Sequence, residues 1–133
     1  MNVVVKACLV LACLAAAPNP AAAETRTMVA KPGMALVLGG GYVMTSTCSA
    51  APLPDIAIVS PPAHGAATVV LATITVPANR QCAGSQVKVR RVLYVPAKQY
   101  HGPDSVTFST SWTASVQTLQ QGSTTDTVSI TVP

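Results

Sequence analysis

The stretch that decides the fold contains two turns, Pro61-Pro62-Ala63-His64-Gly65 and Tyr94-Val95-Pro96-Ala97-Lys98-Gln99-Tyr100-His101-Gly102-Pro103-Asp104-Ser105-Val106-Thr107-Phe108. Gly65 is expected to supply the positive φ that a tight turn needs. Pro96 cannot donate a ladder hydrogen bond, so it ends the strand before it. Asp104 is placed to accept hydrogen bonds from backbone N–H groups of its own turn. The stretch therefore predicts turns with strands on either side.

On either side of these turns, apolar and polar residues alternate with period two between Gly, Pro and Asn residues, which predicts strands and no helix. The predicted strands are residues 34–38, 42–48, 55–59, 67–76, 86–95, 105–113 and 125–132. Residues 39–41, all glycine, are predicted to turn the chain, and residues 120–123 to form a hairpin tip. About seven strands with short turns predict an all-β antiparallel sandwich, with a small β-barrel as the alternative.

The apolar residues of 86–95 change parity within one predicted strand. Val87 and Val89 share one side, whereas Val92 and Tyr94 share the other. Strict alternation cannot bury both sets, so we predict a β-bulge at Arg90-Arg91. Elsewhere the predicted inward residues are Ile56, Ile58, Val106, Phe108, Trp112, Val128, Ile130 and Val132.

The first 23 residues have the three-part pattern of a secretory signal peptide. Lys6 precedes an unbroken apolar run at 7–17, a Pro-Asn-Pro break follows, and Ala21-Ala22-Ala23 forms an A-x-A cleavage site. The apolar run is too short to span a bilayer. We therefore predict a signal peptide at 1–23, a β-sandwich domain at 24–133 without a transmembrane segment, and a periplasmic or secreted location. The alternatives are a buried N-terminal helix and a lipoprotein anchored at Cys13.

Two cysteines remain in the predicted mature chain, Cys48 and Cys82, because Cys8 and Cys13 leave with the signal peptide. An even pair in an oxidising compartment predicts a disulfide. A redox or metal-binding pair is the alternative, but it normally has close spacing such as C-x-x-C. Charged residues are sparse (9%) and Ser and Thr are abundant, which is typical of exposed strands and extracellular surfaces.

Most of the basic residues of the mature chain fall between positions 80 and 98, and they define a candidate binding face. Such a face could meet anionic glycans or a membrane surface. The alternative is solubilising charge on an edge strand, which protects it from pairing. Export and few aromatic residues disfavour nucleic-acid binding. The residues are Arg80, Lys88, Arg90, Arg91 and Lys98.

Catalytic and metal-binding patterns are weak in this chain. His64 and His101 stand beside Gly65 and Gly102 and are interpreted as turn residues, with a zinc or copper site using a methionine as the alternative. The sequence has no G-x-S-x-G element and no phosphate-binding glycine loop. Four acids scattered along the mature sequence disfavour a paired-carboxylate glycosidase. We predict no enzymatic activity and no cofactor. The acids are Glu24, Asp55, Asp104 and Asp126.

The two turns resemble the "P-x-H-G" and "Y-x-P-x-x-x-Y-x-G-x-D-x-x-x-F" elements of bacterial Ig-like and cadherin-like domains, over residues 55–132. The matching residues are Pro62, His64, Gly65, Tyr94, Pro96, Tyr100, Gly102, Asp104 and Phe108. The resemblance implies a single Ig-like extracellular module that acts by binding, adhesion or spacing. Cadherin-type domains hold calcium with clustered acids. The acids of this chain are far apart in sequence, so we do not expect a calcium site from the resemblance.

From the resemblance and the export signal we expect a non-enzymatic binding or adhesion module of the bacterial envelope, with a protein or glycan partner at the cell surface. The alternatives are a structural envelope component without a specific ligand and a small periplasmic metal-binding protein that uses His64 and His101.

Overall fold

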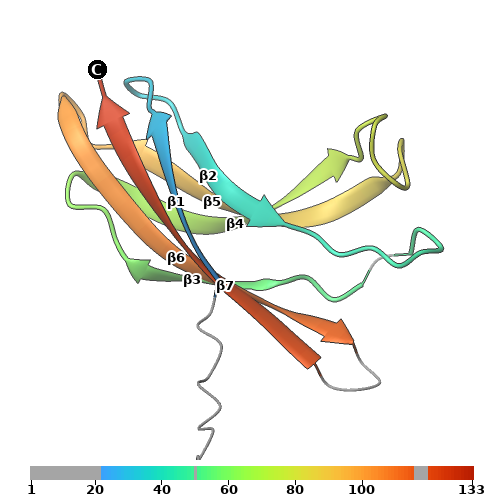
Figure 1. Ribbon diagram of the computed structural model, residues 1–133. Coiled ribbons are helices and arrows are strands. Elements are labelled where there is room, and N and C mark those ends of the chain that lie inside the picture. Colours follow the sequence, from blue (N-terminus) through green and yellow to red (C-terminus); the bar gives the residue numbers. More distant parts are fainter. Residues whose placement is uncertain (1–21, 50, 116–119) are drawn as a thin grey trace, which may run out of the picture.

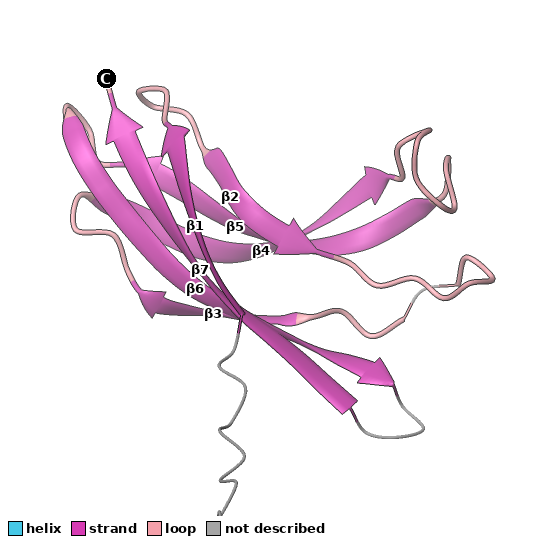
Figure 2. Cartoon of the chain, viewed as in Figure 1, coloured by secondary structure: helices cyan, strands magenta, loops and turns pink. Residues whose placement is uncertain are grey.

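The protein is a two-layer β-sandwich (Figure 1). The computed structural model describes residues 22–49, 51–115 and 120–133. No helix occurs in these residues (Figure 2), so none of them forms an apolar helix long enough to cross a membrane. The predicted all-β sandwich of about seven strands is confirmed, whereas the predicted signal peptide lies outside the described residues apart from its last two. The strands are β1 (Ala22–Val29), β2 (Leu36–Gly41), β3 (Asp55–Ser60), β4 (Gly65–Thr75), β5 (Gln86–Pro96), β6 (Gly102–Ser115) and β7 (Gln120–Val132).

The strands form a four-stranded sheet in the order β1-β7-β6-β3 and a three-stranded sheet in the order β2-β5-β4. Pairing is antiparallel except between β1 and β7, which run parallel from Ala22↔Thr124 to Val29↔Thr131. Sequence reasoning did not predict β1. Two of its inward positions are the charged residues Glu24 and Arg26, so the strand lacks the apolar alternation by which a half-buried strand is identified.

The core lies where the two sheets pack most closely, at the end of the sandwich that carries the C-terminus (Figure 1). The predicted inward residues of β7, and Val106 and Phe108 of β6, are in it, while Ile56 and Ile58 of β3 pack against it. Trp112, also predicted to face inward, lies outside this cluster. Tyr94 and Phe108 are its largest fully buried side chains, one from each sheet. The buried set is Ala30, Leu38, Val92, Tyr94, Val106, Phe108, Val128, Ile130 and Val132.

Three local predictions were wrong. Residues 39–41 continue β2 rather than turning it. Neighbouring atoms leave no room for a Cβ at Gly39 or Gly40, so glycine is needed at these positions for close packing and not for a turn. Residues 42–48 do not form a strand, since the Thr45 hydroxyl accepts the Ser49 N–H at 3.1 Å and closes a local turn. Residues 120–123 belong to β7.

The expected bulge at Arg90-Arg91 is also wrong. The β4–β5 ladder keeps one register from Gly65↔Pro96 to Thr75↔Gln86, and the register shift lies instead in β2, between Val37 and Gly39. Both parities of β5 are buried without a bulge in that strand: Val92 and Tyr94 face the main core, whereas Val87 and Val89 are buried outside that cluster.

The Asp104 carboxylate joins the two predicted turns. Its Oδ1 atom accepts the backbone N–H groups of Ala63 and Ser105, both at 2.9 Å. Its Oδ2 atom accepts the His64 N–H at 3.0 Å and the Tyr94 hydroxyl at 2.8 Å. Asp104 is in β6 and Tyr94 is in β5, so one side chain connects the two sheets and the link between β3 and β4. The expected hydrogen bond within its own turn is confirmed.

Two glycines of the motif have different physical roles. Gly102 has a φ of +138°, a conformation that favours glycine. Gly65 is not among the residues with positive φ, so the sequence expectation for it was wrong. A Cβ at Gly65 would lie 2.5 Å from the Val95 carbonyl oxygen and 2.7 Å from Cε2 of Tyr94, so glycine is needed there for close approach.

The titration of Asp104 and Tyr94 follows from their burial and from the hydrogen bonds of the Asp104 carboxylate. Burial acts to raise the pKa of the Asp104 carboxyl, but hydrogen bonds from the Tyr94 hydroxyl and three backbone N–H groups outweigh it and hold that pKa below its ordinary value. Burial, followed by the hydrogen bond to the charged Asp104, raises the pKa of Tyr94 well above its ordinary value. The pair is therefore an ionised carboxylate with a neutral phenol at neutral pH.

We expect Asp104→Asn to lower the free energy of unfolding at pH 7 by about 1.5–3 kcal/mol, the usual contribution of hydrogen bonds to a charged group. Because the folded-state pKa is depressed, this stabilisation is complete above the unfolded pKa of about 4 and is lost as pH falls through the folded pKa. Urea unfolding between pH 2.5 and 7 should therefore show a shallower acid loss in the variant. Asp55→Asn, at an exposed ion pair, serves as a control with an expected cost below about 1 kcal/mol; equal losses in the two variants would contradict the assignment.

Candidate functional site

The two sheets diverge at the end opposite the core, where the β4–β5 and β6–β7 hairpins extend in different directions (Figure 1). A cleft of about 420 Å³ opens there between the layers. The four-stranded sheet supplies all three of its charged residues, and the end of β2 supplies the opposite wall. Its lining residues are Glu24, Arg26, Gly39, Gly40, Gly41, Tyr42, Val43, Pro54, Phe108, Thr110, Trp112, Thr124 and Asp126. We refer to this site as the inter-sheet cleft.

Three charged residues stand on the inner face of the four-stranded sheet in this cleft. The parallel β1–β7 pairing places Glu24 directly beside Asp126, while Arg26 follows two residues later on the same face of β1. Further along the same strands, the inner face is apolar and belongs to the core, with Met28 packed against it and Val128 within it. The charged positions therefore begin where core packing ends.

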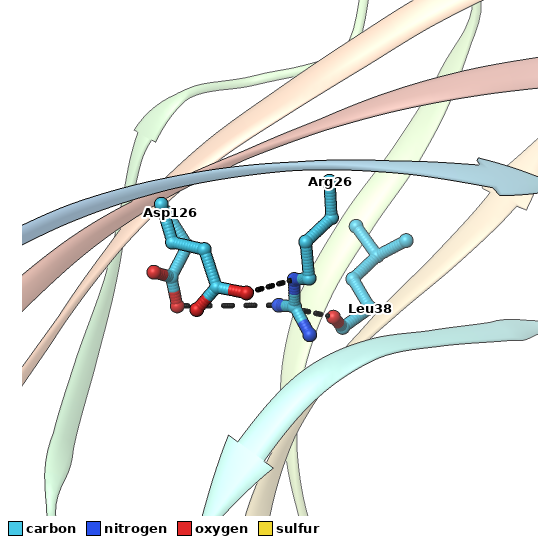
Figure 3. A network of polar contacts seen from close by, with 4 residues as sticks. Arg26, Leu38 and Asp126 are labelled. Carbon is cyan, nitrogen blue, oxygen red and sulfur yellow. Dashed lines mark hydrogen bonds and ion pairs between the residues drawn. The ribbon is translucent and has the colours of Figure 1, made fainter.

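The Arg26 guanidinium uses little of its hydrogen-bonding capacity (Figure 3). Its Nη2 atom donates to the Leu38 carbonyl oxygen at 2.8 Å, and the Asp126 Oδ2 atom lies 4.0 Å from the same nitrogen. Glu24 Oε1 lies 4.0 Å from Nε, which is buried and has no hydrogen-bond partner among the described residues. Both carboxylates are too distant for direct hydrogen bonds, which need about 3 Å. The cleft is therefore lined by an arginine and two carboxylates that make no close hydrogen bonds to one another.

Glycines of β2 form the wall that faces this charged group. A Cβ at Gly39 would lie 2.8 Å from Cζ of Phe108 and 3.0 Å from Nη2 of Arg26. At Gly40 a Cβ would collide with the backbone oxygen of Arg90. Glycine at position 39 lets the two sheets approach while Arg26 lies between them, and glycine at position 40 lets β2 lie close to β5 in its own sheet.

A flat aromatic surface completes the cleft. Trp112 pairs with Gly122 in the β6–β7 ladder, and a Cβ at that glycine would lie 2.5 Å from Cε2 of the indole. The ring therefore packs against the strand backbone at Gly122 and also lines the cleft. Because Trp112 is the chain's single tryptophan, its fluorescence reports on this site.

The structure corrects the prediction that the four acids are scattered. Glu24 and Asp126 are 102 positions apart in sequence (126 − 24) but are register neighbours on adjacent strands. The pairing was missed because β1 was not predicted. A paired-carboxylate glycosidase needs one carboxyl group that is kept protonated in apolar surroundings, whereas both of these flank a guanidinium and the Glu24 side chain is 66% exposed. The arrangement is better suited to hydrogen bonding than to acid catalysis.

The five predicted basic residues do not form one face. Arg80 and Arg91 line a groove of about 630 Å³ together with Tyr42 and residues 39–41. Arg90 donates to the Pro54 carbonyl oxygen at 2.9 Å and to Asp55 at 2.5 Å, linking β5 to the start of β3. The remaining two are exposed but are not in this groove: Lys88 lies beside Leu71 and Thr73, and Lys98 follows β5 at the opposite end of the hairpin from Arg80.

The two histidines lie in the turns that the sequence indicated. The His64 ring stacks on Tyr100 with ring centroids 4.1 Å apart and planes 8° from parallel. His101 Nδ1 lies 2.5 Å from the carbonyl oxygen of Pro133. Among the residues that the structure describes, no three His, Cys, Asp or Glu side chains form a group that could hold a metal ion.

The predicted Cys48–Cys82 disulfide is present, with the two Cα atoms 5.5 Å apart. It joins the β2–β3 connection to the β4–β5 loop. Both cysteines have positive φ, 63° and 67°, a conformation that is unfavourable for residues other than glycine. The bond lies beside Tyr42, since Cys82 and Tyr42 line the same small pocket, and it therefore restrains one rim of the inter-sheet cleft.

Comparison of the chain with protein-family models, with curated proteins and with solved structures gives no match.

We expect Gly39→Ala to lower the free energy of unfolding by about 1–3 kcal/mol, because overpacking at a site against buried Phe108 forces the neighbours to shift. Gly41→Ala is the matched control, because its Cβ would meet only Pro54 at an ordinary 3.4 Å. Urea unfolding of both variants checks the prediction. A Gly39→Ala protein as stable as Gly41→Ala would show that β2 does not confine the cleft in this way.

We expect the Cys48→Ser/Cys82→Ser double variant to lose about 3–4 kcal/mol of stability, since the disulfide closes a loop with a sequence separation of 34. Denaturant unfolding of the oxidised protein and the double variant measures the difference. Mass spectrometry of the unreduced protein should find neither thiol free. Two free thiols, or unchanged stability in the double variant, would show that the disulfide does not restrain the cleft rim.

Proposed function

We propose that the protein is an exported, non-enzymatic Ig-like binding module that takes one ring of a neutral glycan into the inter-sheet cleft. The observation that carries the proposal is the Arg26 guanidinium, which lies between two carboxylates at 4.0 Å and has one hydrogen bond to the part of the protein that the structure describes. Polar groups at core-facing positions of a sandwich weaken its packing. A ligand that hydrogen-bonds to them offsets this cost.

A sugar ring matches the chemistry of this cleft. Each hydroxyl both donates and accepts, so neighbouring hydroxyls can bridge a guanidinium N–H and a carboxylate oxygen at once. The C–H face of the ring can lie on the Trp112 indole, where apolar contact replaces contact with solvent. Binding sites of this kind combine aromatic surface with a few convergent polar groups.

The charge of the cleft favours a neutral glycan over an acidic one. Arg26 contributes one positive charge, whereas Glu24 and Asp126 contribute two negative charges, so the group carries a net charge of about −1 (1 − 2). An acidic sugar would meet like charge there. The groove with Arg80 and Arg91 is the place where an anionic glycan would bind instead, which allows the two sites to be separated experimentally.

The Ig-like and exported parts of the proposal rest on different features. The turn motif and its Asp104 hydrogen bonds support an Ig-like module. The disulfide and the signal-peptide pattern support an oxidising compartment outside the cytoplasm. Binding without catalysis is supported by the cleft, where each carboxyl lies 4.0 Å from the Arg26 guanidinium.

Titration with neutral oligosaccharides of glucose, mannose, galactose and N-acetylglucosamine should change the Trp112 emission. By calorimetry, Trp112→Ala and Asp126→Asn should each raise Kd at least tenfold, or about 1.4 kcal/mol, because they remove the stacking surface and one acceptor. The matched control is the Arg80→Ser/Arg91→Ser double variant, which should bind the neutral sugar normally.

The opposite pattern would refute the cleft as the site. If an oligomer of an acidic sugar binds and the Arg80→Ser/Arg91→Ser variant loses it, the basic groove is the functional surface. If no saccharide changes the emission or releases heat, the glycan proposal fails. Far-UV circular dichroism of each variant establishes that it is folded.

A further inference from the structure

We propose that a second copy of the chain pairs with the free edge of β4 in antiparallel orientation, which would join two three-stranded sheets into one of six strands. This proposal is independent of the glycan site. In the described residues β4 pairs only with β5, so its other side ends the sheet. It has 11 residues, or roughly 36 Å at about 3.3 Å per residue.

Hydrogen bonds at both ends of the hairpin identify the backbone groups that are free. Ala97 N–H donates to the His64 oxygen at 2.9 Å, and Val76 N–H donates to the Ser85 oxygen at 2.8 Å. Both pairs continue the unbroken β4–β5 register by one residue. Even-numbered residues of β4 therefore bond to β5, and the odd-numbered residues point their N–H and C=O groups to the open edge. These are Gly65, Ala67, Val69, Leu71, Thr73 and Thr75.

The edge lacks the features that usually prevent strands from pairing. From Gly65 to Thr75 there is no charged residue, no proline and no register shift. Val69 and Leu71 are 38% and 64% exposed, although they are apolar. A long, regular and uncharged edge with exposed apolar side chains is a template for another strand.

The other three edge strands are protected. β1 carries Glu24 and Arg26. β2 has six residues and a register shift after Val37. β3 also has six residues, begins at Asp55 and is shifted after Ile58. Protection at these edges and its absence at β4 indicate that the β4 edge has a partner.

The sequence of β4 is complementary to itself when antiparallel. Its first residues are small, Gly65 to Ala67, and its last are β-branched, Thr73 to Thr75. A two-fold axis at Val70 aligns all 11 residues and places each small residue opposite a larger one. It also brings Val69 of each copy opposite Leu71 of the other, so the exposed apolar side chains cover one another. This self-complementarity favours a second copy over an unrelated strand, and two-fold dimers are the commonest assemblies.

In this register the outward backbone N–H and C=O groups of β4 become hydrogen-bonded to the second copy. Pairs across the axis have position numbers that sum to 140, so odd residues meet odd residues and exchange their outward N–H and C=O groups. The charged residues opposite β4 in the β4–β5 ladder are Lys88, Arg90 and Arg91, which pair with Thr73, Leu71 and Val70. They lie on β5, one strand behind the edge. The two copies of Arg91 are level with the two-fold axis and are therefore three strand spacings apart, about 14 Å. Pairing therefore places no like charges directly opposite one another.

Engineered cysteines test the register directly. At a two-fold axis, Val70 of one copy faces Val70 of the other as a non-hydrogen-bonded pair with Cα atoms about 4.5 Å apart, within the range of a disulfide. Val70→Cys should give a disulfide-linked dimer under mild oxidation, identified by peptide mapping. Thr68→Cys is the matched control: its two copies would be four positions apart, about 13 Å, and should remain unlinked. Equal cross-linking of both variants, or of neither, would overturn the register.

Sedimentation of the folded, oxidised protein tests pairing itself. The unmodified chain should show a concentration-dependent dimer, and Leu71→Lys should raise the dimer Kd at least tenfold by placing like charges on the edge. Thr131→Lys, at an exposed position of the interior strand β7, should leave the dimer unchanged. A protein that stays monomeric, a dimer unaffected by Leu71→Lys, or a monomer that binds a separate extended peptide along β4 would each reject the proposal.

Discussion

The carboxylate of Asp104 is the interaction on which the rest of the structure depends. It accepts hydrogen bonds from Tyr94 in one sheet and from the link between β3 and β4, while it belongs to the other sheet. Because Tyr94 is fully buried, its hydroxyl has no access to solvent and needs this acceptor. The two sheets are thereby held together at one end, and the positions of both turns are fixed.

Holding the sheets at one end allows them to separate at the other. Near Asp104 the layers share an apolar core, whereas the extended hairpins beyond Phe108 and Val92 diverge. In this region Arg26, Glu24 and Asp126 occupy inner-face positions that would be apolar in a closed sandwich. The disulfide and the Arg90–Asp55 contact cross this region and limit how far it opens. The inter-sheet cleft is therefore a consequence of the architecture rather than a separate addition to it.

Sequence reasoning found the parts of the molecule where local chemistry and burial agree. The β-sandwich, the disulfide and the inward residues of β6 and β7 were predicted because alternation and cysteine count report them directly. Most of the errors concern contacts between residues distant in sequence, whereas the strand at 42–48 was predicted wrongly because of a local turn at Thr45. Gly39 and Gly122 indicate turns when they are read locally, but contacts with Phe108 and Trp112 require glycine at these two positions within strands. The charged cleft was missed for the same reason, because a strand with Glu24 and Arg26 facing inward has no apolar period.

The two hairpins that extend beyond the core also differ in what they leave exposed. The β6–β7 hairpin has β1 beside one edge and β3 beside the other, and its inner face lines the cleft. The β4–β5 hairpin has a neighbour only beside β5, and its free surface is a backbone edge. A face presents side chains and selects a ligand by their chemistry, whereas an edge presents backbone groups and selects another strand. The two proposed sites therefore differ in kind, one a cleft between the layers and the other an edge of one layer, and because they share no residue, a mutation in one leaves the side chains of the other in place.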